Sequence, residues 1–184
     1  MAQKNGKNTG PALNIYLLGF MCAGKTSVGA ALARALRRPF RDSDALLRKR
    51  TGERLAVIIR RDGLGAFRRL EAGLVKELAG RGGQVIAFGG GVYPSGRRAG
   101  LLKRTGTTVF LHCPWPELAK RLKEERAGRP LLDGPWDKAL PRAKKLYTAR
   151  LKFYRRADLR LDTAGLTPLR AAGKIKKALK NENL

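Results

Sequence analysis

The chain has 184 residues, 43% of them hydrophobic, which fits one globular domain with a sizeable core. Forty lysine and arginine residues against 14 aspartate and glutamate residues give a formal net charge of +26. The only cysteines are Cys22 and Cys113 and the only histidine is His112, which argues against a zinc site and against a disulfide scaffold. No apolar stretch approaches the roughly 18 residues of a membrane span, so we expect a cytoplasmic protein without a membrane partner.

Short apolar strands alternate with helical patterns along the chain. Residues 1–12 are polar and are expected to be a disordered arm, and residues 13–184 are expected to form a single domain. The expected strands are Ile15–Leu18, Pro39–Asp42, Val85–Phe88, Thr107–Cys113 and Leu159–Asp162. Helical patterns follow the first strand, with Val28, Ala31, Leu32 and Ala35 on one face, and lie near residues 43–51, 54–61, 66–80, 95–103, 115–126, 136–156 and 167–180. The alternation predicts an α/β fold with a parallel sheet between helices, and ligands at the carboxyl ends of its strands.

The most specific motif follows the first strand. Residues 19–26, Gly-Phe-Met-Cys-Ala-Gly-Lys-Thr, fit the phosphate-binding loop pattern G-x-x-x-x-G-K-[ST] between a strand and a helix. Backbone N–H groups of such a loop and the N-terminus of the following helix attract phosphate. The pattern predicts that Lys25 reaches the outer phosphates and that Thr26 holds a magnesium ion. The nucleotide-binding candidates are Gly19, Cys22, Ala23, Gly24, Lys25, Thr26 and Ser27.

Two further strand ends carry residues that suit a ligand site. Asp42 and Asp44 leave the second strand together, so one carboxylate can face a metal and the other an acceptor; helix capping by Asp42 or Ser43 is the alternative. The run Gly89, Gly90 and Gly91 follows the third strand. Glycines allow a ligand to approach the backbone closely, although a structural turn would also explain them.

Three arginines lie in sequence patterns that either a ligand site or ordinary protein structure would explain. Arg68 and Glu71 lie three residues apart on one helix, as a surface ion pair also would. Arg129 precedes Pro130 in a stretch that suits either a mobile lid over about residues 123–136 or a plain surface loop. Tyr147, Arg150 and Tyr154 follow helical spacing, which any amphipathic helix would give.

Taken in chain order, these motifs resemble those of the shikimate kinases. That family shows G-F-M-x-x-G-K-[ST], D-[ST]-D, F-R-x-x-E, G-G-G, R-P-L-L and R-x-x-x-Y, and this chain carries all of them between residues 14 and 163. The resemblance implies a three-layer P-loop kinase fold, with a five-stranded parallel sheet in the order 2-3-1-4-5 flanked by helices, and with a mobile lid. It also implies ATP-dependent phosphorylation of the 3-hydroxyl of shikimate, a step of chorismate and aromatic amino-acid biosynthesis.

The resemblance also implies roles for individual residues. The catalytic residues would be Lys25, which neutralises the transferred phosphoryl group, Asp44, which binds the acceptor hydroxyl as base or orienting group, and Arg129 on the lid. Thr26 and Asp42 would hold Mg²⁺, and Arg121 would stack on adenine. The shikimate-binding residues would be Asp44, Arg68, Gly89, Gly90, Gly91 and Arg150, with both arginines on the carboxylate and Glu71 fixing Arg68.

Two alternatives remain open at this stage. A P-loop kinase acting on another small hydroxy acid, such as gluconate or quinate, would share the loop and the lid arginine. A kinase-like protein that binds polyanions through its basic surface would explain the charge, but no nucleic-acid signature is visible and we expect no specific nucleic-acid partner. We expect a monomer. The chain departs from the family at Leu64, where a glutamate is usual.

Overall fold

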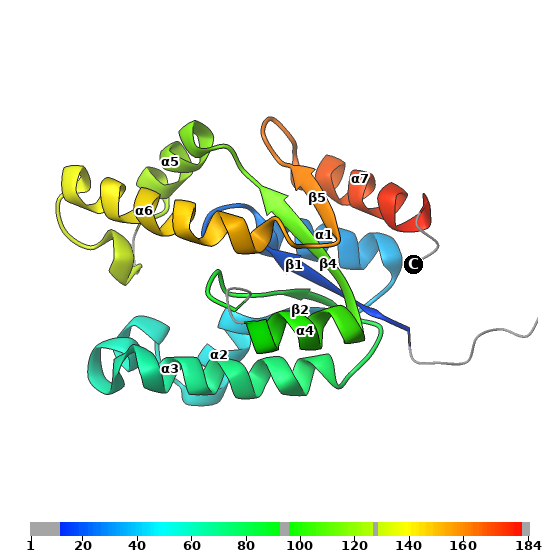
Figure 1. The fold of residues 1–184 in the computed structure, drawn as a ribbon, viewed down its shortest axis with the longest axis horizontal. Coiled ribbons are helices and arrows are strands. Elements are labelled where there is room, and N and C mark those ends of the chain that lie inside the picture. The colour runs from blue at the N-terminus through cyan, green and yellow to red at the C-terminus, as the bar shows by residue number, and fades with distance from the viewer. Residues whose placement is uncertain (1–11, 93–95, 127–128, 182–184) are drawn as a thin grey trace, which may run out of the picture.

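The computed structural model describes residues 12–92, 96–126 and 129–181. In these residues a five-stranded parallel sheet has the order β2-β3-β1-β4-β5, and helices cover both of its faces (Figure 1). The strands are β1 (Asn14–Leu18), β2 (Phe40–Asp42), β3 (Val85–Ala87), β4 (Gly106–His112) and β5 (Leu159–Asp162). The helices are α1 (Lys25–Leu36), α2 (Ser43–Thr51), α3 (Leu55–Ala79), α4 (Gly96–Thr105), α5 (Trp115–Glu124), α6 (Trp136–Tyr154) and α7 (Pro168–Asn181), with a short 3₁₀ turn at Pro130–Leu132.

Side chains of the central strand β1 belong to two separate hydrophobic cores, because successive side chains of a strand point to opposite faces of the sheet. Ile15 and Leu17 belong to a core that contains residues of α1 and α7. Tyr16 and Leu18 belong to the other core, which contains residues of α3, α4, α5 and α6. All of β1 is buried, as expected of a parallel strand with helices on both sides. These two cores give the three-layer architecture that the sequence predicts.

The predicted strand order and fold class are confirmed. The patterns at 54–61 and 66–80 predict two helices, and the structure agrees, because α3 consists of two helical segments that meet at a kink. The kink is at Gly63, whose φ of 81° and ψ of 163° lie outside the helical region, in a conformation that side chains with a Cβ rarely adopt. The departure from the family at Leu64 lies just after the kink, with 55% of that residue exposed.

Some expectations fall on residues outside the described ranges. These include residues 1–11 of the expected arm, residues 127–128 of the expected lid and residue 95 of the helical pattern expected near 95–103. Among the described helices, none is both long and apolar enough to cross a bilayer.

The fold brings the chemically important segments to one edge of the sheet. Strands β1, β2 and β3 are parallel neighbours, so their carboxyl ends lie together. The loop at residues 19–26 follows β1, Asp42 ends β2, and the three glycines follow β3. This edge is where a parallel α/β sheet binds its ligands.

Candidate active site

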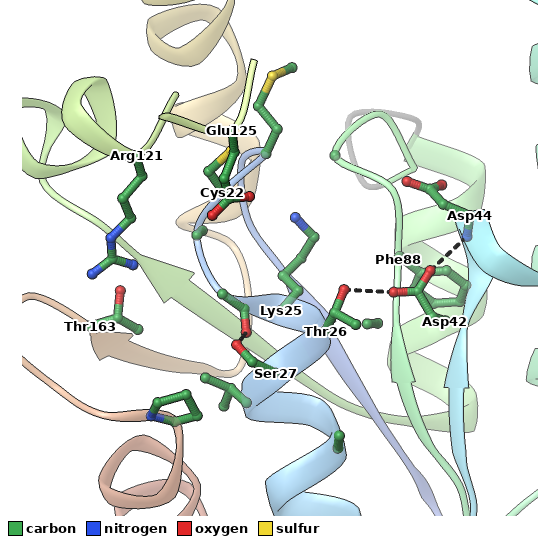
Figure 2. A pocket seen from close by; sticks show the side chains of 18 of the residues that line it. Cys22, Lys25, Thr26, Ser27, Asp42, Asp44, Phe88, Arg121, Glu125 and Thr163 are labelled. Carbon is green, nitrogen blue, oxygen red and sulfur yellow. Dashed lines mark hydrogen bonds between the residues drawn. The ribbon is translucent and has the colours of Figure 1, made fainter. Parts of the chain in front are cut away.

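A cleft of about 720 Å³ opens at this edge of the sheet. In and beside this cleft we distinguish two groups of residues: the loop side, formed by residues 19–27 with Arg121 and Arg129, and the arginine side, formed by Asp44, Arg68, Glu71, Gly89–Gly91, Arg150 and Tyr154, most of which lie at the border of the cleft. Figure 2 shows Lys25 pointing into the cleft, with Cys22 and Arg121 on one flank and with Asp42 and Asp44 on the other. The two sides therefore meet at Lys25.

The backbone of the loop side has the conformation that an anion site needs. Gly19 and Gly24 have φ angles of 148° and 85°, and Cys22 also lies in the left-handed region, at 59°. A Cβ at Gly19 would lie 2.7 Å from the carbonyl oxygen of Leu111 on β4, so only glycine fits there. Gly24 is the N-cap of α1 and offers no capping side chain, which leaves the first N–H groups of the helix for a ligand.

Lys25 lies over the loop. Its Nζ donates hydrogen bonds to the carbonyl oxygens of Gly19 at 3.0 Å and Phe20 at 2.7 Å. Burial lowers the pKa of Lys25 to about 8, while Asp44, Cys22 and Asp42 act in the opposite direction. A bound phosphate would act in the same direction as these acidic groups, because an anion favours the charged amine.

The two carboxylate oxygens of Asp42 accept different hydrogen bonds. Its Oδ1 accepts from the backbone N–H groups of Asp44 and Ala45, both at 3.0 Å, and so caps α2. Its Oδ2 accepts from the Thr26 hydroxyl at 2.7 Å. The capping alternative raised from the sequence is therefore correct and coexists with the contact to the loop. Ser43 does not cap the helix: its buried hydroxyl accepts from Gly89 N at 3.0 Å and connects the start of α2 to the triple glycine.

Asp44 borders both sides of the cleft. Burial raises its pKa, and Lys25 is the largest influence in the opposite direction. A Cβ at Gly89 would lie 2.7 Å from Asp44 Oδ1 and 3.3 Å from Glu71 Oε1, so the absence of a side chain at Gly89 makes room for both carboxylates.

Arg68 is fixed from two directions on the arginine side. Its Nη1 donates to Glu71 Oε2 at 2.7 Å, and Glu71 is only 2% exposed. The pair is thus no surface ion pair, which was the ordinary explanation of the spacing. The guanidinium also lies so close to Gly91 that a Cβ there would overlap it. A glycine at position 91 is therefore required by the position of Arg68.

Arg150 and Tyr154 contact the same run of glycines from α6. A Cβ at Gly90 would lie 3.2 Å from Arg150 Nη1, and the Tyr154 hydroxyl donates to the Gly90 carbonyl. Burial raises the pKa of Tyr154 to about 12, so this phenol stays protonated and remains a donor. Arg150 also lies over the Phe20 ring, 5.9 Å from its centroid, and so connects the arginine side to the loop.

The outer part of the loop side carries the two remaining predicted arginines. Arg121 Nε donates to Glu117 at 3.1 Å, and Arg129 donates to the carbonyl of Glu125 at 2.8 Å and to its carboxylate at 3.2 Å. Both arginines line the cleft together with Pro168. Burial raises the pKa of the nearby Cys22 thiol to about 11, so this cysteine is protonated near neutral pH.

The structure brings most of the predicted site residues to one cleft. Those that line it are Cys22, Ala23, Gly24, Lys25, Thr26, Ser27, Asp42, Asp44, Gly89, Gly90, Arg121 and Arg129. Gly19, Arg68, Gly91 and Arg150 do not line this cavity but contact the loop or the glycines at its border. Sequence reasoning missed the roles of Ser43, Glu125 and Arg98, a residue of α4 that also reaches Glu71. Ser43 is the middle residue of the D-[ST]-D motif, but the motif does not reveal its contact with Gly89; no motif marks Glu125 or Arg98.

Comparisons with known proteins agree with this geometry. The family model described as "Shikimate kinase" matches residues 21–180. A curated shikimate kinase of Aquifex aeolicus is 38% identical over 149 residues, which are 81% of this chain and 86% of the relative. One of Geobacter sulfurreducens is 42% identical over 153 residues, 83% of this chain and 82% of the relative.

Solved structures give the same picture. A shikimate kinase from Acinetobacter baumannii, solved in complex with shikimate, has a TM-score of 0.88 and 32% identity, covering 94% of this chain and 96% of that one. A gluconokinase from Sinorhizobium meliloti has a TM-score of 0.59 at 21% identity, which shows a shared fold alone.

Proposed function

The chain belongs to the shikimate kinase family, and from this premise we propose that it transfers the γ-phosphoryl group of ATP to the 3-hydroxyl of shikimate. The products are shikimate 3-phosphate and ADP, and the reaction is a step of chorismate and aromatic amino-acid biosynthesis. The observation that carries the proposal is the position of two arginines, Arg68 and Arg150, beside the triple glycine that also borders Asp44. Such a site suits a small ring that carries both a carboxylate and hydroxyl groups.

The loop side would hold the nucleotide. We propose that phosphates bind to backbone N–H groups of the loop and to the uncapped start of α1, since residues 21–27 line the cleft. Lys25 would neutralise the phosphoryl group during transfer; its position where the two sides meet supports this role. We propose that Arg121 and Pro168 contact the adenine ring and that Arg129 closes over the phosphates.

The residues present fit a magnesium ion. The Thr26 hydroxyl and the Asp42 carboxylate lie 2.7 Å apart, and Mg²⁺ prefers such hard oxygen ligands, usually together with phosphate oxygens and water. We propose that Thr26 ligates Mg²⁺ and that Asp42 helps to position it. When bound, the ion would neutralise charge on the phosphates.

Asp44 and the arginines would position the acceptor. A carboxylate whose pKa is raised by burial, as that of Asp44 is, is a stronger base than one in water, and we propose that Asp44 accepts a hydrogen bond from the reacting hydroxyl. The planar guanidinium groups of Arg68 and Arg150 suit a carboxylate, which they can bind through two hydrogen bonds each. Phosphoryl transfer depends mainly on such positioning and on charge stabilisation.

The proposed acceptor rests on the site and on the comparisons, whereas the proposed location and oligomeric state rest on the sequence. The structural likeness to a gluconokinase extends to the fold alone, whereas the curated relatives at 38% and 42% identity are shikimate kinases, which favours shikimate as the acceptor. We further propose that the protein acts as a cytoplasmic monomer and that its net charge of +26 attracts polyanions only in a salt-sensitive way.

A panel of acceptors tests the proposal. ADP release is measured with ATP and Mg²⁺ in the presence of shikimate, quinate, gluconate or no acceptor. We expect turnover with shikimate in the usual kinase range of about 1–100 s⁻¹, and little with the other acceptors. Faster turnover with gluconate or quinate than with shikimate would identify that compound as the acceptor instead.

A further inference from the structure

Arg98 reaches the arginine side of the cleft from a helix that carries none of the predicted site residues. It lies on α4, and its Nη1 is 3.2 Å from Glu71 Oε2. Arg68 donates to the same carboxylate oxygen at 2.7 Å. Two guanidinium groups from different helices, α3 and α4, therefore share one acceptor atom.

The contact between Arg98 and Glu71 is largely buried. The side chain of Glu71 is 2% exposed and that of Arg98 is 20% exposed. Within the described residues, Arg98 Nε is buried without a hydrogen-bond partner. An unpaired buried donor is unfavourable, so the contact with Glu71 is what compensates for placing this arginine inside the protein.

Charge explains why Glu71 needs two arginines. Burial raises the pKa of Glu71, and the neighbouring Asp44 acts in the same direction. Arg68 and Arg98 both oppose these effects and favour the carboxylate. A further polar group nearby is the Tyr154 phenol, which stays neutral because burial raises its pKa. Loss of either arginine would therefore remove positive charge from the surroundings of the buried Glu71 carboxylate. Its pKa would rise, and Glu71 would take up a proton more readily.

We propose that Arg98 is a positioning residue for the acceptor, because by sharing Glu71 Oε2 with Arg68 it keeps Glu71 charged and holds the Arg68 guanidinium against Gly91, facing the carboxylate of the substrate. This inference rests on the proposed function for the identity of the acceptor. Arg98 itself needs no contact with the substrate. Without Arg98, a protonated Glu71 is a weaker acceptor for Arg68, and the guanidinium loses its fixed direction.

The test compares Arg98→Met and Arg98→Lys with Arg97→Met. Arg97 is the preceding residue on the same helix and is exposed, so it is a matched control for the loss of one positive charge. We expect Arg98→Met to raise the KM for shikimate by about tenfold, with the KM for ATP and kcat changed less than about twofold. Arg98→Lys should recover part of the loss, and Arg97→Met should behave as the wild type. Equal KM values for shikimate in Arg98→Met and wild type would overturn the inference.

A double-mutant cycle and the pH dependence separate positioning from general damage to the fold. In the Glu71→Gln background, adding Arg98→Met should change the KM for shikimate by less than about threefold, since the charge to be compensated is gone. In the wild type this KM should rise as pH falls and Glu71 takes up a proton, and Arg98→Met should move the rise to higher pH. Full additivity of the two substitutions, or an unshifted pH profile, contradicts the proposal.

A crystal structure of Arg98→Met tests the inference independently of activity. We expect the Arg68 guanidinium to have left its place between Glu71 and Gly91, whereas an unchanged contact between Arg68 and Glu71 would refute the positioning role. Failure of the proposed function looks different: the wild type would then turn over another acceptor in the panel, or none. With another carboxylated acceptor the same KM ratios still apply, and with none the crystal structure decides.

Discussion

The two sides of the cleft would bind anions by different means. The loop side would rely on backbone: Cys22 and Gly24 have left-handed φ angles, and α1 begins without a capping side chain, so backbone N–H groups would bind phosphate there. The arginine side relies on side chains that come from α3, α4 and α6 and are oriented by other buried groups, above all by Glu71. The loop side is therefore local in the sequence and the arginine side is not.

The difference has consequences for how each side tolerates change. A backbone site keeps its N–H groups when side chains are replaced, as long as each residue can adopt the required φ angle. A network of buried charges depends on every member, because removing one leaves its partner unpaired.

Lys25→Ala removes the charged side chain that lies where the two sides meet. Because we propose that this lysine neutralises charge that develops during transfer, we expect kcat to fall by about 10³-fold or more. Circular dichroism should show an unchanged fold, because within the described residues the Lys25 side chain donates its hydrogen bonds to the carbonyl groups of Gly19 and Phe20. Turnover close to that of the wild type would contradict the mechanism.

Asp44→Asn keeps the shape of the side chain but removes its charge and basicity. We expect kcat to fall by roughly 10²- to 10⁴-fold, the usual contribution of a general base. ATP affinity, measured by calorimetry, should change little because the loop remains intact. A variant with full activity would show that Asp44 is neither base nor orienting group.

Arg68→Ala and Arg150→Ala each remove half of the expected carboxylate contact. Truncating one partner of a buried charge pair costs about 2–5 kcal/mol, so we expect the KM for shikimate to rise by at least about 30-fold. The KM for ATP serves as the internal control. If shikimate KM stays the same in both variants, the carboxylate is bound elsewhere.

Gly91→Ala tests the arginine side through its backbone. The added methyl group would overlap the Arg68 guanidinium and displace it, and we expect the KM for shikimate to rise about tenfold. Gly73→Ala is the matched control, because an added Cβ at this exposed position on α3 meets nothing within 4 Å. That control should keep wild-type kinetics and gain some stability, since alanine favours helix by about 1 kcal/mol over glycine.

Cys22→Gly should have the smallest effect. The φ angle of 59° at Cys22 suits glycine, and the loop is expected to bind phosphate through its N–H groups. We expect the KM for ATP to stay within about threefold of the wild type, against the tenfold change at Gly91. A large loss of ATP affinity would mean that the thiol side chain, rather than the backbone, supports the nucleotide.

The same contrast decides what could be predicted from the sequence. The loop was predictable because eight consecutive residues and their flanking strand and helix specify it. The sheet order followed from the resemblance, and the approximate strand limits from short apolar segments that alternate with helical patterns. The break in α3 was predicted, since the two helical patterns leave residues 62–65 between them, but the sequence did not show that Gly63 alone makes it. Arg98 was missed because its partner Glu71 is 27 residues away, and only the packing of α4 against α3 brings them together.

Shikimate and its methyl ester, compared as acceptors, test the carboxylate contact most directly, because the ester keeps the ring and hydroxyl groups but has no charge. The account predicts that wild-type kcat/KM is at least about 30-fold lower for the ester and that Arg68→Ala discriminates much less between the two. Equal kcat/KM values for both acceptors in the wild-type protein would contradict the assignment of the arginine side to the carboxylate.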